Sequence, residues 1–116
     1  IKLDTNGINY DVIKTLVDEN IVDYIALDFK APKYKFESIT KNKHYDKFEK
    51  TLDFLIDSNI EFEVRTTVHT DLLDENDINE IIKTLHQKGY KNTYYLQNYF
   101  ETDKETIGNI GPQKRK

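Results

Sequence analysis

Hydrophobic residues recur along the chain with two periods, one typical of strands and one typical of helices. Short runs rich in β-branched and aromatic residues predict four strands, near residues 1–5, 22–29, 60–68 and 93–99. Between them, apolar residues spaced three and four apart predict three helices, near residues 8–19, 45–58 and 75–88. The polar and basic residues 33–43 predict a loop with one helical turn near residues 36–40.

Turn and capping residues mark the boundaries of these elements. Asn6-Gly7 stops the first strand, and Ala31-Pro32 ends the second. Asp74 is a good N-cap for the last helix, since Asp77 follows three residues later, and Lys88-Gly89 is typical of its C-terminal end. Strand and helix thus alternate as βαβαβαβ, which predicts an α/β fold of parallel strands, either a small open sheet or an arc of a (β/α) barrel.

Side chains in the predicted strands alternate between apolar and polar, whereas a parallel sheet covered on both faces carries near-continuous aliphatic runs. In the second strand the apolar face holds Ile25, Leu27 and Phe29, and the opposite face holds Ala26, Asp28 and Lys30. In the third strand the apolar face holds Phe62, Val64, Thr66 and Val68, and the opposite face holds Glu63, Arg65, Thr67 and His69. We therefore expect one apolar face and one face that collects charges.

The charges on that second face gather where the strands end. Asp4, Asp28, Lys30, Arg65 and His69 all lie toward the C-terminal ends of strands, where α/β sheets and barrels bind ligands. A buried charge costs roughly several kcal/mol unless it is paired or solvated, so this pattern favours a cavity for a polar small molecule. The alternative is a half-solvated sheet with Asp–Lys and Glu–Arg pairs on its surface.

Composition narrows the classes of function. The chain has 116 residues, 17 basic and 21 acidic side chains and a net charge of -4, which indicates a single domain. No apolar run approaches the roughly 18 residues of a membrane helix, and the mild acidity gives no reason to expect a nucleic-acid partner. We expect a cytoplasmic protein. Since cysteine is absent, the chain offers no thiolate nucleophile and no sulfur ligand for zinc or an iron–sulfur cluster.

The sequence opens at Ile1, inside a predicted strand, and contains no methionine. We therefore expect it to be a piece of a longer protein. An incomplete barrel leaves strand edges unpaired, and such edges allow a homodimer through an edge strand.

Four motifs occur in an order that resembles one family: Lys2-Leu-Asp-Thr-Asn-Gly7, Val22-Asp-Tyr-Ile-Ala-Leu-Asp-Phe-Lys-Ala-Pro32, Phe62-Glu-Val-Arg-Thr-Thr-Val68 and Tyr95-Leu-Gln-Asn-Tyr99. The chain resembles the radical-SAM activating enzymes of glycyl-radical proteins over roughly residues 1–100. It is most similar to activating proteins of anaerobic ribonucleoside-triphosphate reductase, and pyruvate formate-lyase activating enzymes are more distant.

This resemblance implies a partial (β/α) barrel over residues 1–100, with a flexible tail over residues 101–116. It also implies a 4Fe–4S cluster and S-adenosylmethionine at the top of the barrel. In this family the cluster donates an electron, the sulfonium is cleaved, and the resulting radical removes a hydrogen from a glycine of the partner enzyme. Carried over by motif, the residues near the methionine end of the cofactor are Asp4, Thr5, Asn6, Asp28 and Lys30, with Arg65 as a companion.

The chain departs from the family in one decisive respect. The CxxxCxxC motif that holds the cluster lies upstream of Asp-Thr-Asn-Gly in the family, and this chain has no cysteine. The resemblance therefore implies the C-terminal part of an activase, which binds no cluster or other cofactor on its own and is inactive in isolation. Phe100-Glu101 also stands where an arginine and a proline are expected.

Two other interpretations remain open. One is a small α/β domain that binds a partner protein without chemistry, as response-regulator modules do. The other is an aldolase-like barrel piece in which Lys30 forms an imine with a carbonyl substrate.

Overall fold

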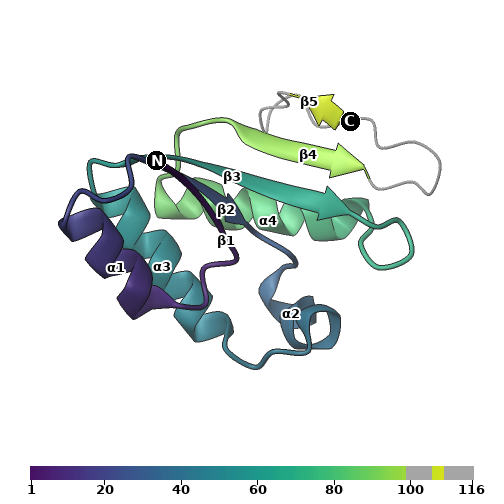
Figure 1. Cartoon of the computed structure of the whole chain (residues 1–116). Helices are drawn as coiled ribbons and strands as arrows, with labels where there is room; N and C mark the ends of the chain where they lie inside the picture. The colour runs from purple at the N-terminus through teal and green to yellow at the C-terminus, as the bar shows by residue number, and fades with distance from the viewer. Residues whose placement is uncertain (99–105, 109–116) are drawn as a thin grey trace.

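The computed structural model describes residues 1–98 and 106–108. In these residues the strands form one sheet, and the helices lie along the same side of it (Figure 1). The elements in chain order are β1 (Lys2–Thr5), α1 (Tyr10–Asp18), β2 (Tyr24–Asp28), α2 (Lys33–Thr40), α3 (Tyr45–Asp57), β3 (Glu61–Val68), α4 (Glu75–Lys88), β4 (Tyr94–Asn98) and β5 (Thr106–Gly108). The predicted strands and helices are confirmed, with boundaries that differ by one or two residues.

The order of the strands decides between the two parallel architectures. β1, β2, β3 and β4 are parallel neighbours in the order of the chain. A doubly wound sheet reverses its strand order and has helices on both faces, whereas a (β/α) barrel adds each strand beside the previous one. The fold is therefore α/β with a partial, barrel-like arc, as predicted.

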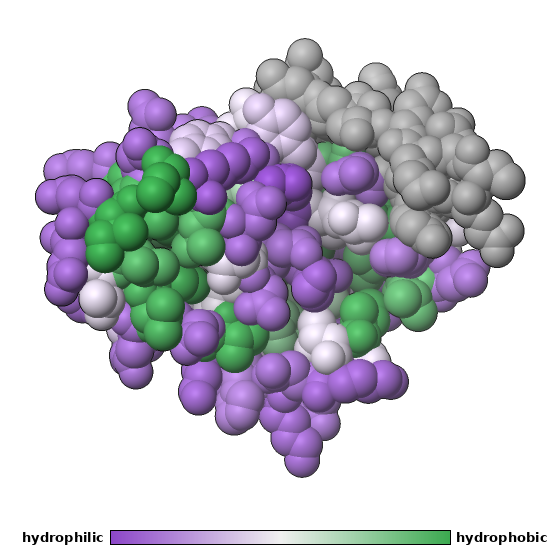
Figure 2. All heavy atoms as spheres, in the orientation of Figure 1, coloured by the Kyte–Doolittle hydropathy of each residue, from purple (hydrophilic) through white to green (hydrophobic). Residues whose placement is uncertain are grey.

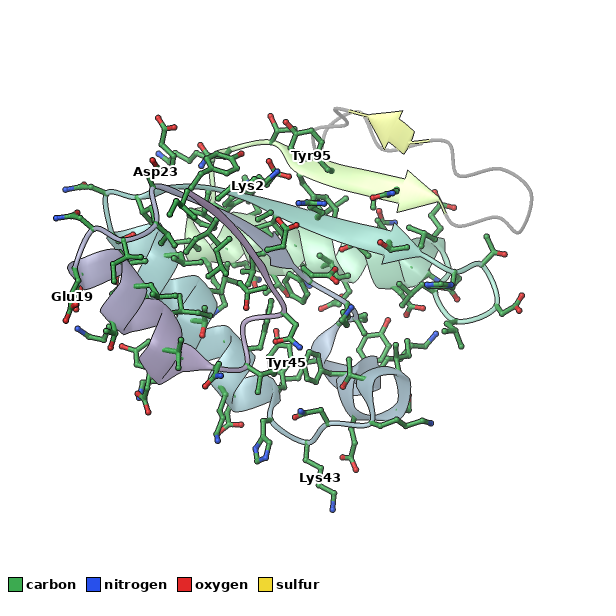
Figure 3. The ribbon with its side chains drawn as sticks, viewed as in Figure 1. Lys2, Glu19, Asp23, Lys43, Tyr45 and Tyr95 are labelled. Atoms are coloured by element: carbon green, nitrogen blue, oxygen red, sulfur yellow. The ribbon has the colours of Figure 1, made fainter. Side chains whose placement is uncertain are left out.

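The core lies between the sheet and the helices. The alternate positions of the strands are fully buried in this core, as shown by Ile25, Leu27, Phe29 and Val64. Phe29 packs on Phe48 of α3 with ring centroids 4.6 Å apart, and Tyr45, on the helix side of the sheet in Figure 3, completes the aromatic cluster. The predicted alternation is thus confirmed, and the residues between these positions form the other face, which we call the open face.

The prediction of a loop over residues 33–43 is wrong for residues 33–35, because Lys33–Thr40 forms helix α2, which includes the helical turn predicted near residues 36–40. Its single buried residue, Phe36, packs edge-on against the ring of Tyr45 at 5.1 Å. The helix ends at Lys41, which adopts the left-handed conformation. One buried aromatic residue gives too weak a period to predict a helix, so this helix depends on tertiary packing.

Strand β5 was not predicted. It pairs antiparallel with β4 through Leu96 opposite Gly108 and Gln97 opposite Thr106, with a bulge between the two pairs. It falls within residues 101–116, for which we expected a flexible tail, and the remainder of that segment lies outside the described residues, as does Phe100-Glu101.

The surface over the strands is polar. In Figure 2 the middle of the view is mostly purple, and the largest green area lies at the side where α1 and the start of β1 lie, with smaller green areas toward the lower edge. The exposed large hydrophobic residues Ile1, Val12 and Ile21 belong to this region of the chain. None of the helices in the described part of the chain is long and apolar enough to cross a membrane.

Candidate functional site

Five of the six predicted site residues line one cavity on the open face. Asp4, Thr5, Asn6, Asp28 and Arg65 surround a volume of about 330 Å³ at the C-terminal ends of β1, β2 and β3. They converge because the strand register places Asp4 beside Ala26 on β2, and Asp28 beside Arg65 on β3. The geometry expected from strand alternation is therefore present, and we call this space the Asp4 cavity.

The sixth residue, Lys30, lies beside this cavity. Its Nζ donates to Asp28 Oδ2 at 2.6 Å. Lys30 also lines two neighbouring cavities, one of about 190 Å³ shared with His69 and one of about 310 Å³ shared with Asn6. Ile39 of α2 borders both, so α2 is a wall of the space around Lys30.

Arg65 bridges two carboxylates that lie on different strands. Its Nη2 donates to Asp4 Oδ1 at 3.0 Å, and its Nε donates to Glu63 Oε2 at 2.9 Å. The other oxygen of Glu63 accepts from the Tyr24 hydroxyl at 2.5 Å. Burial, together with this bond to Glu63, raises the pKa of Tyr24 to about 12, so Tyr24 remains a donor at neutral pH.

The turn between β1 and α1 holds Thr5 and Asn6 at the cavity rim. Thr5 Oγ1 accepts from the Gly7 amide and Asn6 Oδ1 accepts from the Ile8 amide, both at 3.1 Å. Gly7 has a φ of +80°, and its carbonyl accepts from the buried Thr51 hydroxyl at 2.6 Å. This turn is therefore tied to α3, and the side-chain oxygens of Thr5 and Asn6 act mainly in shaping it.

A cluster of polar contacts around the buried carboxylate of Asp77 fixes the wall made by α2. Asp77, in the first turn of α4, is 2% exposed and accepts from Lys35 Nζ at 2.5 Å and from the Tyr34 hydroxyl at 2.6 Å. Burial by itself would raise the pKa of Asp77, but the bonds from Lys35 and Tyr34 hold it at about 2. Asp77 also completes the predicted capping box with Asp74, so the start of α4 and helix α2 are joined at one carboxylate.

Sequence reasoning missed three residues of the site as functional candidates. Ala26 and Thr67 line the Asp4 cavity, and Glu63 holds Arg65. The signal was available, since strand alternation puts all three on the same face as Asp28 and Arg65. The alternation did not indicate how far the arginine side chain reaches.

The charges of the site determine which groups fit. Three carboxylates (Asp4, Asp28 and Glu63) face two cations (Lys30 and Arg65), which leaves one formal negative charge. Such a set suits a ligand with both an ammonium and a carboxylate, such as the methionine end of S-adenosylmethionine. It does not suit an iron–sulfur cluster, because the chain has no cysteine, and residues 1–98 and 106–108 contain no group of three potential metal ligands.

Comparison with known proteins finds a similar protein that is considerably longer than this chain. A protein of Methanocaldococcus jannaschii, provisionally named as a glycyl-radical enzyme activating enzyme, is 33% identical over 90 residues, which cover 73% of this chain. The matched region is 38% of the relative, so the chain spans well under half of its length. No family model matches the chain, and no solved structure matches it.

Proposed function

We propose that this chain is the C-terminal part of a cytoplasmic radical-SAM activase, and that its open face binds the methionine end of S-adenosylmethionine. The observation that carries the proposal is the convergence of Asp4, Asp28 and Arg65 on one cavity, with Lys30 paired to Asp28 beside it. The similarity to a protein named as a glycyl-radical enzyme activating enzyme supports the same assignment. The partner of the longer protein is then a glycyl-radical enzyme, for which we favour anaerobic ribonucleotide reductase.

The side chains have distinct roles in this proposal. Lys30 donates to the carboxylate of the ligand, and Asp28 or Asp4 accepts from its ammonium group. The 2.6 Å pair between Lys30 and Asp28 keeps both groups at the cavity until the ligand arrives, because opposite charges offset each other there. Arg65 holds Asp4 in place from β3.

The 4Fe–4S cluster belongs to the longer protein in this proposal. Such a cluster supplies the electron that cleaves the sulfonium, and it is held by thiolates that this chain does not contain. The chain's own contribution is therefore binding and orientation of the ligand, and the isolated chain is expected to cleave none of it.

An NMR titration of the ¹⁵N-labelled chain with S-adenosylmethionine tests the proposal. The sequence led us to expect no cofactor on the chain alone, but the cavity around Asp4, Asp28 and Arg65 changes this expectation. We now expect weak binding, because only part of the pocket is present, with shifts at the amides of Asp4, Thr5, Ala26 and Asp28. S-adenosylhomocysteine, which lacks the sulfonium charge, is the comparison ligand and should bind less well to the acidic site.

Variants distinguish binding of S-adenosylmethionine at the Asp4 cavity from non-specific electrostatic attraction to the chain. Asp4→Ala and Lys30→Ala should each weaken binding about tenfold, which corresponds to one lost charge-assisted hydrogen bond. Lys43→Ala, at an exposed lysine in the loop between α2 and α3, is the matched control and should bind as the wild type does. Equal binding by all three variants, or shifts away from these strand ends, would contradict the proposal.

A further inference from the structure

The open face carries two cavities, and a chain of polar contacts lies between them. The Asp4 cavity lies toward the C-terminal ends of the strands. A second cavity of about 400 Å³ is lined by Tyr24, Glu63 and Tyr95 together with Glu61 and Lys91. Lys2 and Tyr95 lie on this side of the sheet, away from the helices (Figure 3).

Glu63 is held from both sides. One of its carboxylate oxygens accepts from the Tyr24 hydroxyl and the other from Arg65 Nε, and its side chain is only 15% exposed. A carboxylate with both oxygens engaged has little freedom to rotate. Because a guanidinium is planar, a bond at Nε fixes the direction in which its terminal nitrogens point.

Arg65 reaches across a whole strand. β1 and β3 both pair with β2, so their axes lie about 9.6 Å apart, at about 4.8 Å for each pair. The residue of β2 that is in register with both Asp4 and Glu63 is Ala26, which is 2% exposed although it belongs to the open face. A methyl group at this position leaves room for the arginine to cross toward Asp4.

We propose that Glu63, anchored by Tyr24, is a positioning residue that holds Arg65 across β2 at Ala26, where the arginine closes the floor of the Asp4 cavity. The two cavities of the open face are then kept separate, and a ligand is confined to the C-terminal end of the sheet. This positioning of Arg65 follows from its contacts with Glu63 and Asp4. Its consequence for S-adenosylmethionine rests on the proposed function.

The arginine content of the chain makes a direct test possible. Arg65 and Arg115 are the two arginines, so the Nε–H spectrum contains two signals, and Arg65→Lys assigns them. Glu63→Ala should speed solvent exchange of the Arg65 Nε–H about tenfold, because it removes a charge-assisted hydrogen bond. Tyr24→Phe removes a single hydroxyl and should speed the same exchange by a smaller factor. Glu61→Ala, on the same strand and face, is the matched control and should leave it unchanged.

Two further readouts separate positioning from a general loss of structure. In Tyr24→Phe the backbone amide protons of Leu27 and Val64 should exchange with solvent at wild-type rates. If Tyr24 only stabilised the sheet, its loss would speed the exchange of these amide protons together with that of the Arg65 Nε–H. Binding of S-adenosylmethionine to Tyr24→Phe and Glu63→Ala should weaken several-fold, whereas Glu61→Ala should bind normally.

The outcomes distinguish the two proposals. Arg65 Nε–H exchange that is unchanged in both Glu63→Ala and Tyr24→Phe would overturn the positioning role of Glu63, whatever the ligand. Faster Arg65 exchange in these variants, with no binding of S-adenosylmethionine by any form of the chain, would support positioning and overturn the proposed function.

Discussion

Arg65 on β3 contacts Asp4 on β1 at 3.0 Å although strand β2 lies between them. The contact depends on a small residue, Ala26, at the crossing point and on Glu63, which fixes the guanidinium from the other side. Since Asp4 is 73% exposed, solvent screens its half of the bridge. The bridge therefore contributes more to the shape of the cavity than to the stability of the sheet.

Double-mutant cycles measure how much each ion pair of Arg65 contributes to stability. We expect a coupling free energy between Asp4 and Arg65 of about 1 kcal/mol or less, as for other exposed ion pairs. The Glu63–Arg65 coupling should be larger, about 1 to 2 kcal/mol, because Glu63 is shielded from solvent. Urea unfolding of the single and double alanine variants gives both values. A larger coupling for Asp4 than for Glu63 would contradict the assignment of Glu63 as the residue that holds Arg65.

The turn after β1 gives a second prediction. A Cβ at Gly7 would lie 2.9 Å from both Leu27 Cδ1 and Phe48 Cδ1, and the φ of Gly7 is +80°. Gly7→Ala should therefore lower the free energy of unfolding by about 2 to 4 kcal/mol, from backbone strain and overpacking together.

Gly89 is the matched control for this substitution. It has a φ of +90°, but a Cβ there meets nothing within 4 Å. Gly89→Ala should therefore cost only the strain, about 1 kcal/mol. Equal losses at the two glycines, measured by urea unfolding, would show that packing against Leu27 and Phe48 does not restrict Gly7.

The convergence of Asp4, Asp28 and Arg65 could be predicted from the sequence for a simple reason. Side chains alternate along a strand, and parallel strands end at the same edge of the sheet, so polar residues at strand ends share one face. The Asp74–Asp77 capping box and the stop at Gly89 could be predicted too, since both are local.

The features that could not be predicted depend on contacts between residues distant in the sequence. Helix α2 is held by the packing of its one buried residue, Phe36, against α3 and by the bonds of Tyr34 and Lys35 to Asp77 of α4. The role of Ala26 depends on an arginine that crosses from another strand, which the alternation of β2 does not show. Strand β5 has three residues and pairs antiparallel with β4, and a strand this short has no period to detect.

Tyr24 gives a prediction about the origin of its pKa. Burial is the largest cause of its rise to about 12, and the bond to Glu63 comes next. In Glu63→Gln the pKa of Tyr24 should therefore fall, yet stay above the ordinary value of 10.0, because the burial remains. Titration of ¹³C-labelled tyrosine by NMR, with Tyr24→Phe to assign the signal, provides the measurement. A pKa that returns fully to the ordinary value would show that Glu63 is the main cause.

The Asp77 cluster gives a prediction about stability against pH. The pKa of Asp77 lies at about 2 in the folded chain against an ordinary value of 3.8, because Lys35 and Tyr34 stabilise the carboxylate. The unfolded chain therefore takes up this proton first as the pH falls. The stabilisation is fully present above about pH 4, and it is lost as the pH falls toward 2.

The corresponding measurement is the free energy of unfolding between pH 5 and 2 for the wild type and three variants. Between these limits the wild type should lose about 2 kcal/mol more than Asp77→Asn does, which is the free energy equivalent of the pKa difference. Lys35→Met should lose less than the wild type, because it removes the nearest cation. Lys33→Met, an exposed lysine on the same helix α2, should follow the wild type. If Asp77→Asn and the wild type fall in parallel with pH, the carboxylate of Asp77 does not hold α2 through its charge, and the join between α2 and α4 depends on the packing around it instead.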